Sequence, residues 1–400
     1  MLQGKAIFIL SLMKFDGLAS TNFTVAKYLA KSNDVYYIEH PFTWKDYFKL
    51  NKGSDSFRAR KEGFNFFSNG LLSKKVDGVN ILISYPVLPI AFLPKGRLYD
   101  VMLNINENII ASRIKKIIKE KNIKDYIFIN SYDFHYPGVA KKLRPSLSLY
   151  HCVDPIVGHY DRKHGVKGET KLVRNSDVII CTSKALYKEK LVQNENTYFV
   201  PNAADLIWEE SRPYRKHKSV AHIKQPITGY IGAIERRMDY DLLNKVSEHN
   251  PEMTFVFVGP VYKEHVPDWF FNRPNIRHVP PVPYSEVPEM IASFDICMIP
   301  FKKDDISNTI FPLKLFEYLG VGKPVIVTDF NEDLQDYTQN SVCFVDDVAS
   351  FNNAIHQLLE NNNPHLVEKR INIAKQNTWE VRTKEISGII NNHLSAKHVA

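Results

Sequence analysis

The chain has 400 residues, of which 44% are hydrophobic and 24% are charged, so it has the composition of a globular protein of two ordinary domains. No apolar run is long enough to span a bilayer, and no Cys-x-x-Cys pair or Cys/His cluster indicates a metal site. The four cysteines are widely spaced, and we therefore expect reduced thiols in a cytoplasmic protein.

The net charge of +8 is unevenly distributed, because residues 1–200 carry +13 and residues 201–400 carry −5. A basic half indicates an anionic partner, such as a membrane surface with anionic lipids, a diphosphate-linked lipid acceptor or a nucleic acid. Solubilising surface charge is the alternative. No zinc-finger, RRM-like or helix-turn-helix motif is present, so we do not predict a nucleic-acid partner.

The N-terminal half begins with a predicted strand at 6–12, a helix at 21–31 and a strand at 35–38. This is a βαβ unit, but it lacks the Gly-x-Gly-x-x-Gly motif of dinucleotide-binding proteins. Residues 40–100 interleave aromatic and basic side chains. As a group they favour contact with an acceptor or a membrane, whereas any single aromatic residue is as consistent with core packing.

Further along this half, the pattern predicts a helix at 106–121 and strands at 126–130 and 147–154. The last of these ends in Asp154. Catalytic groups in open α/β sheets gather at the carboxyl ends of strands, and a carboxylate there could remove a proton from an attacking hydroxyl. A turn or helix-capping role is equally consistent with Asp154, which precedes Pro155.

The segment 206–226 is polar and basic, and we predict that it is a linker. A second strand–loop–helix unit is predicted to begin at Ile227. We expect the strand to end at Gly232 and the next helix to start near Asp239. Glycine would let the backbone approach a ligand closely, and Arg237 in the loop could pair with a diphosphate. A solvated loop is the alternative for the arginine. Strands are predicted at 255–258, 275–280, 295–300 and 342–344, and helices at 287–293, 349–360 and 381–391.

The stretch 311–329 reads FPLKLFEYLGVGKPVIVTD and predicts a short helix followed by a buried strand at 325–327. We expect 307–309 to cap the helix, Pro312 to lie in its first turn, and Gly320 and Gly322 to end it. Lys314 and Glu317 share the polar face near a helix N-terminus. Lys314 could bind a diphosphate there, and Glu317 could accept hydrogen bonds from a ribose diol. Spacing alone is more typical of a surface ion pair.

The pattern PLKLFEY-L-x-x-GKPV-x-x-T-D resembles the nucleotide-sugar site of GT-B glycosyltransferases in the Glu-x7-Glu (group 1/family 4-like) group. Glu317 matches the second glutamate, which binds the donor ribose in that group, and Thr309 stands where the first would be. The form Pro-x-Lys-x-x-Glu-Tyr is similar to bacterial cell-surface polysaccharide glycosyltransferases, including those of teichuronic-acid type. The segment 150–154 resembles their Tyr-x-Cys-x-Asp, in which the aspartate of one inverting relative is the general base.

The resemblance implies an α/β GT-B fold, with two Rossmann-like domains facing a central cleft and a C-terminal helix crossing back. The acceptor domain would be 1–205, the donor domain 227–378, and the returning helix and tail 379–400. Asp16, Gly17 and His135 become acceptor-side candidates, and Gly232, Arg237, Lys314, Glu317 and Thr309 donor-side candidates.

The implied activity is a metal-independent hexosyltransferase without a cofactor, acting from a nucleotide diphosphate sugar on a saccharide or lipid-linked acceptor. A nucleotide-sugar epimerase and a binding scaffold without turnover are the alternatives.

Overall fold

The computed structural model describes residues 2–17, 20–50, 52–206 and 213–399, so part of the predicted linker, 207–212, lies outside the described residues. The chain forms two compact units. The first comprises Met1–Pro201 and Arg382–Ala400, and the second comprises Asn202–Val381. Among the described residues, no helix combines the length and apolarity that a membrane-spanning segment requires.

The first unit is built on a seven-stranded sheet in the order β3-β2-β1-β4-β5-β6-β7, and the pairings between its strands are parallel. Its central strands are buried along their length, which explains why they read as continuous apolar runs rather than as alternating patterns. The strands are β1 Ala6–Ser11, β2 Asp34–Glu39, β3 Asn80–Leu82, β4 Tyr126–Ser131, β5 Leu147–Cys152, β6 Val178–Cys181 and β7 Thr197–Phe199.

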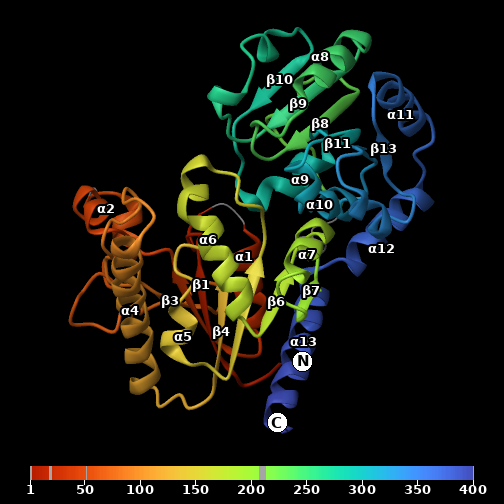
Figure 1. Ribbon diagram of the computed structural model, residues 1–400. Coiled ribbons are helices and arrows are strands. Elements are labelled where there is room, and N and C mark those ends of the chain that lie inside the picture. The colour runs from red at the N-terminus through yellow and green to blue at the C-terminus, as the bar shows by residue number, and fades with distance from the viewer. Residues whose placement is uncertain (1, 18–19, 51, 207–212, 400) are drawn as a thin grey trace. The chain divides into compact units, whose positions relative to one another are not determined.

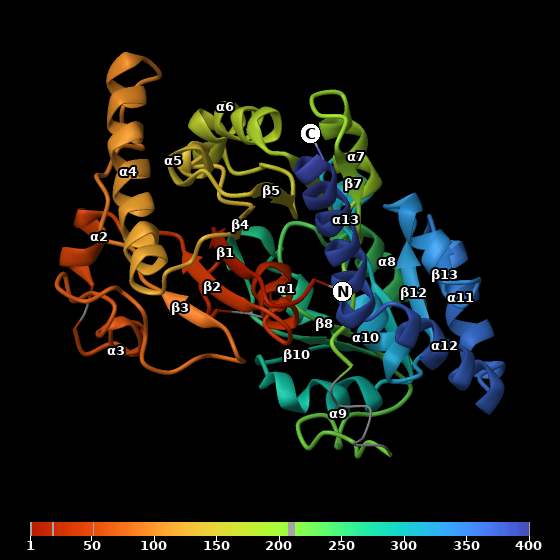
Figure 2. The ribbon, with the colours of Figure 1, turned by 90° about the horizontal axis from the view of Figure 1, so that it is seen from below.

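Helices flank this sheet (Figure 1). The longest of those before residue 201 begins at Arg97, nine residues before the predicted start. The final helix lies beside β7 (Figures 1 and 2), where Tyr198 Oη is 2.9 Å from His393 Nε2 and Lys397 pairs with Asp177 at 2.6 Å. The helices are α1 Thr21–Leu29, α2 Trp44–Lys49, α3 Asp55–Arg60, α4 Arg97–Glu120, α5 Val139–Leu143, α6 His159–Asn175, α7 Lys184–Leu191 and α13 Trp379–Val399.

The second unit has a six-stranded parallel sheet in the order β10-β9-β8-β11-β12-β13. Its strands are β8 Ile227–Ile231, β9 Thr254–Val258, β10 Ile276–Val279, β11 Ile296–Ile299, β12 Val325–Thr328 and β13 Cys343–Val345. Its α-helices are α8 Tyr240–His249, α9 Val287–Ala292, α10 Lys314–Gly320, α11 Val348–Glu360 and α12 Pro364–Gln376, the last of which the sequence pattern did not predict. Its 3-10 turns are η2 Lys263–His265, η3 Phe270–Asn272, η4 Tyr284–Glu286, η5 Ser307–Thr309 and η6 Glu332–Tyr337.

Both sheets reverse their strand order at an equivalent place, between β1 and β4 in the first unit and between β8 and β11 in the second. In open α/β sheets, ligands bind outside the carboxyl ends of the strands at such a reversal. The loops after β1, β4, β8 and β11 are therefore the positions at which functional side chains are expected.

Candidate functional site

In the second unit, the loop after β8 approaches the start of α10 closely. Gly232 has a φ of +139°, and a Cβ built on it would lie 2.8 Å from Lys314 Nζ. Lys314 Nζ donates to Tyr230 Oη at 2.9 Å and lies 4.3 Å from the centre of that ring, while Tyr230 Oη donates to the Ala233 carbonyl at 2.9 Å. The absence of a side chain at Gly232 thus lets the Lys314 ammonium pack closely against the backbone of this loop.

The Lys314 ammonium sits in a poorly solvated setting. Burial, with a smaller contribution from the positive charge of Arg237, lowers the pKa of Lys314 to about 7, although Glu317 and Glu235 oppose the shift. The ring of Phe301, at the end of β11, lies 5.0 Å from Nζ. An ammonium held this way favours an added negative charge, because an anion would replace the solvation that burial removes.

Arg237 also faces this region, but it is held by a neighbour. Its guanidinium forms an ion pair with Glu235 of the same loop and lies 5.4 Å from the centre of the Phe301 ring. The expected helix start is confirmed, since the Asp239 side chain caps α8 by accepting from the Leu242 N–H. Arg237 could bind a diphosphate only by sharing or leaving its contact with Glu235.

Glu317 lies one turn along α10 from Lys314. Tyr284 Oη donates to Glu317 Oε1 at 3.1 Å, and burial raises the pKa of the Glu317 carboxyl despite that hydrogen bond and the nearby Lys314. Lys314 and Glu317 therefore place a half-buried ammonium and a half-buried carboxylate on one short helix at the strand reversal.

The start of α10 differs from the prediction. Helix α10 begins at Lys314 without a side-chain cap, so Pro312 precedes the helix instead of lying in its first turn. Asn202 Nδ2 and Asn331 Nδ2 donate to the carbonyls of Phe311 and Ile310, at 2.8 and 2.9 Å, and hold this segment outside the helix.

Thr309 ends the 3-10 turn η5 and does not cap α10. Its hydroxyl donates to the Ile306 carbonyl at 2.6 Å, which is a contact within its own turn.

Gly232→Ala is expected to weaken ligand binding at Lys314 at least tenfold and to destabilise the protein by about 1–2 kcal/mol, because φ is positive and Lys314 must move. Urea denaturation and a binding titration would measure both effects. Gly388→Ala is the matched control, since nothing lies within 4 Å of a Cβ at that helical position and alanine favours a helix. Equal effects of the two changes would contradict the role given to Gly232.

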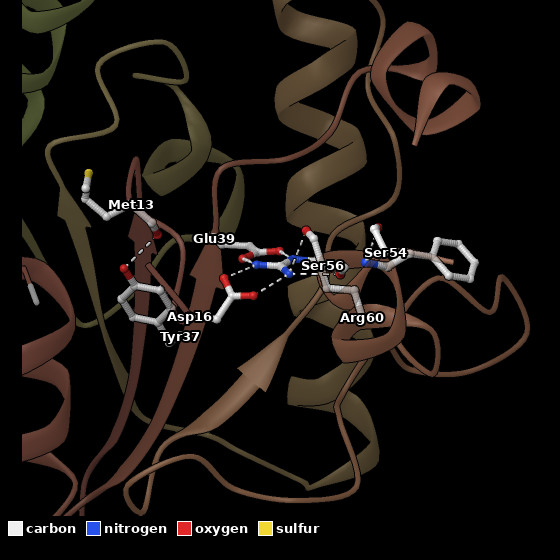
Figure 3. Close-up of polar contacts among 8 residues, drawn as sticks. Met13, Asp16, Tyr37, Glu39, Ser54, Ser56 and Arg60 are labelled. Atoms are coloured by element: carbon white, nitrogen blue, oxygen red, sulfur yellow. Dashed lines mark hydrogen bonds and ion pairs between the residues drawn. The ribbon is translucent and has the colours of Figure 1, made fainter. Parts of the chain in front are cut away.

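In the first unit, the predicted residue Asp16 lies in the loop after β1 and is bound by a buried arginine. The Arg60 guanidinium contacts both oxygens of Asp16, at 2.6 and 2.8 Å, and both oxygens of Glu39, at 2.5 and 2.8 Å (Figure 3). These hydrogen bonds lower the pKa of Asp16. Gly17, the next residue, has ordinary space for a Cβ, 3.5 Å from the Lys14 carbonyl, and so its position does not require glycine.

The other two predicted residues of this unit lie near different strands. Asp154 is exposed and follows the end of β5 by two residues. His135 lies beyond β4, with its Nε2 atom 3.4 Å from Asp161 Oδ1 and its ring 5.4 Å from that of His40. His40 in turn contacts Asp133 through Nδ1 at 2.9 Å. The structure therefore places His135 beside a histidine–aspartate pair that the sequence analysis did not identify.

Comparison with known proteins shows which fold this arrangement of two parallel sheets belongs to. Residues 236–387 match a family described as glycosyl transferase-like. The chain is similar in fold to the sucrose-phosphate synthase of Thermosynechococcus elongatus, with a TM-score of 0.68 and 14% identity over 98% of this chain and 100% of that one. It is also similar to Anabaena HepE in complex with UDP, with a TM-score of 0.65 and 12% identity over 97% and 100% of the two chains.

The chain has the GT-B fold.

Among curated proteins, this GT-B chain is 27% identical over 258 residues to TuaH of Bacillus subtilis (strain 168), whose name assigns it provisionally as a teichuronic acid biosynthesis glycosyltransferase. The match covers 60% of this chain and 65% of TuaH. The predicted α/β GT-B fold and the predicted resemblance to this group of proteins are both confirmed.

The sequence could have pointed to His40 and Asp133 as candidate site residues, because each follows the carboxyl end of a strand. His40 comes directly after β2, and Asp133 follows β4 by two residues. What the sequence could not show is that β2 and β4 flank the same central strand, which brings the two side chains together.

Proposed function

We propose that this GT-B protein is a glycosyltransferase that binds a nucleoside diphosphate sugar in its second unit and transfers the sugar to a saccharide or lipid-linked acceptor. The observation that carries the proposal is the placement of Lys314 and Glu317 on one short helix at the strand reversal, where the backbone of Gly232 approaches the Lys314 ammonium closely. The relatives lend support, since HepE was solved with UDP and an E. coli trehalose-6-phosphate protein with UDP-2-fluoro glucose.

In the proposed reaction, the leaving diphosphate is neutralised by Lys314, with Arg237 as a second cation, and this charge takes the role that a metal has in other transferases. Glu317 accepts hydrogen bonds from the ribose diol, and the nucleotide sugar is a co-substrate that needs no further cofactor. In this proposal Thr309 takes the position of the glutamate of the resembled group, and its side chain is shorter. We therefore propose that any contact of this position with the sugar comes from its hydroxyl.

The acceptor belongs, in this proposal, to the first unit. Asp16, Gly17 and His135 are the acceptor-side candidates, and the reaction needs a group that removes the proton of the attacking hydroxyl. Asp154 is the candidate for that role that the sequence suggests.

We further propose a role in cell-surface polysaccharide synthesis, at an anionic membrane surface on the cytoplasmic side. The similarity to TuaH supports the pathway. The exposed side chains of Phe48 and Phe67, 78% and 94% accessible, support the membrane contact together with the exposed Lys45 and Lys49 of α2. The proposal includes no nucleic-acid partner.

A thermal-shift titration with UDP, GDP, TDP, ADP and CMP tests the donor site. A ligand at 100 times its Kd stabilises a protein by about 2.7 kcal/mol, so one of these nucleotides should raise Tm visibly. Glu317→Gln should weaken its binding roughly 10- to 100-fold, because hydrogen bonds to a charged group contribute about 1.5–3 kcal/mol.

The control for this titration is Glu360→Gln, at the exposed end of α11, which should respond as the wild type does. Stabilisation by none of the nucleotides would contradict the donor site. A bound nucleotide without sugar transfer would favour a binding scaffold instead.

A further inference from the structure

A histidine and an aspartate meet across the carboxyl end of β1 in the first unit. His40 follows β2 and Asp133 follows β4, and β1 lies between these two strands. The His40 Nδ1 atom is 2.9 Å from Asp133 Oδ2. The pair therefore lies where the strand order of this sheet reverses, which is the place at which α/β sheets bind their ligands.

Asp133 is fixed from several directions. Its side chain is completely buried, and its backbone N–H donates to Asn130 Oδ1 at 2.8 Å while the Asn130 amide donates to its carbonyl at 3.0 Å. The preceding residue, Tyr132, has a φ of +65°, a conformation that costs a non-glycine residue energy and is found at functional sites. The second carboxylate oxygen, Oδ1, is buried and has no hydrogen-bond partner within the described part of the chain. The hydrogen bond to His40 is therefore the side-chain contact that stabilises the negative charge of Asp133 within the described residues.

His40 is the accessible member of the pair, with 32% of its side chain exposed. Because Nδ1 faces a carboxylate, the neutral ring carries its proton on Nδ1 and leaves Nε2 as an acceptor. Within the described residues, no hydrogen bond engages Nε2. The ring packs beside His135 and Tyr136, both at 5.4 Å between ring centres.

The charged groups around His40 favour its protonated form. Burial by itself would lower the pKa of His40, but the nearby charge of Asp133 and its hydrogen bond, followed by Asp161 and Glu39, raise it above its ordinary value. Asp161 acts from α6 and also faces His135, whereas Glu39 ends β2 and is paired with Arg60. Such a histidine accepts a proton more readily than an isolated imidazole does.

We propose that His40 is the general base that takes the proton of the acceptor hydroxyl, and that Asp133 is its positioning residue. This inference rests on the proposed glycosyltransferase function. In the step, the acceptor oxygen forms a bond to the anomeric carbon as its proton passes to His40 Nε2. The bond from that carbon to the diphosphate oxygen breaks, and the nucleoside diphosphate leaves with the electron pair. Asp133 stabilises the imidazolium that results.

The test uses the full chain and the nucleotide sugar whose nucleotide stabilises it, with water in place of the acceptor hydroxyl, and measures the release of free nucleoside diphosphate by hydrolysis. His40→Gln is expected to lower that rate at least 100-fold, since a general base contributes about 10²- to 10⁴-fold. The increase in Tm that the nucleotide causes should be similar in His40→Gln and in the wild type, within a factor of two, because the proposed donor site lies in the other unit. His249→Gln, at the exposed end of α8, is the matched control and should leave the rate unchanged.

Asp133→Asn supplies a readout that a structural role would not change. Asparagine keeps an oxygen near Nδ1 but removes the charge, so the acidic limb of the pH–rate profile should move to lower pH as the rate falls. An unmoved limb, or a His40→Gln enzyme with normal turnover, would overturn the proposal. Loss of turnover in Asp154→Asn with normal turnover in His40→Gln would assign the base to Asp154. If the wild type binds no nucleotide, the proposed function fails by itself, before the base is tested.

Discussion

Replacing Arg60 by methionine is expected to destabilise the protein by about 3–5 kcal/mol, the range for breaking a buried ion pair from one side. The Arg60 side chain is 0% exposed, and its guanidinium bridges Asp16 and Glu39, which is itself only 2% exposed (Figure 3). Methionine approximates the volume of the arginine stem, so the effect comes mainly from the carboxylates left without a partner. Urea denaturation at pH 7 would measure the change in the free energy of unfolding.

The same variant has a predicted pH dependence. Burial already raises the pKa of Glu39 above its ordinary value, against the opposing effect of Arg60. Without that arginine the pKa should rise further, so the folded state binds a proton over a wider range of pH than the unfolded state. The free energy of unfolding of Arg60→Met should therefore fall as pH rises through that range. The difference between the variant and the wild type should become smaller as pH falls.

Arg58→Met is the matched control, because it lies on the same helix and its ion pair with Asp55 is exposed at both ends, 64% and 96%. We expect a change below about 0.5 kcal/mol for this surface pair. If Arg60→Met and Arg58→Met lost similar amounts of free energy of unfolding, the buried ion pairs of Arg60 would contribute no more to stability than an exposed pair.

Lys314→Met is expected to weaken nucleoside diphosphate binding roughly 10- to 100-fold, because it removes a charge-assisted contact to the diphosphate. In the wild type the affinity should fall as pH rises above 7. The pKa of Lys314 is lowered to about 7, whereas the terminal phosphate, with a pKa of about 6, is already ionised there. Calorimetric titration with UDP between pH 6 and 9 would show this slope, and the variant should lack it.

The stability of the ligand-free protein should depend on pH in the opposite direction, rising as pH increases above 7. Between pH 7 and the usual lysine value of 10.5, the unfolded chain holds a proton on Lys314 that the folded chain lacks, so the free energy of unfolding rises with pH. Lys314→Met removes this dependence and should raise Tm at neutral pH while it weakens binding. Lys303→Met, at a side chain 70% exposed in the loop after β11, should change neither property. A lower Tm for Lys314→Met would show that burial of the Lys314 charge does not destabilise the free protein.

Much of the fold could be predicted from hydrophobic pattern, because parallel strands buried on both faces leave continuous apolar runs. β1, β4 and β12 were found this way, within one or two residues of their observed ends. The start of α4 was missed because its first turns, from Arg97, carry exposed apolar residues that give no clear face. The start of α10 was misplaced because two asparagines distant in sequence, Asn202 and Asn331, hold the preceding carbonyls.

The candidate site was predictable where its residues are close in sequence and not where they meet through the sheet. Lys314 and Glu317 share a helix, and their spacing was enough to select them. Arg60, by contrast, looked like one of several solvated basic residues among the aromatic side chains of 40–100. Its burial depends on two carboxylates that the folded sheet brings to it from 21 and 44 positions away.

The path of the chain through its two units also bears on how it is made. The first unit comprises Met1–Pro201 and Arg382–Ala400, so its last helical segment is translated after the whole of the second unit. On the ribosome, the surface beside β7 that packs against α13 stays uncovered until about 180 further residues have been made, which at 5–20 residues per second takes roughly 10–35 s. The N-terminal unit is therefore the last to be completed, although it is the first to be synthesised.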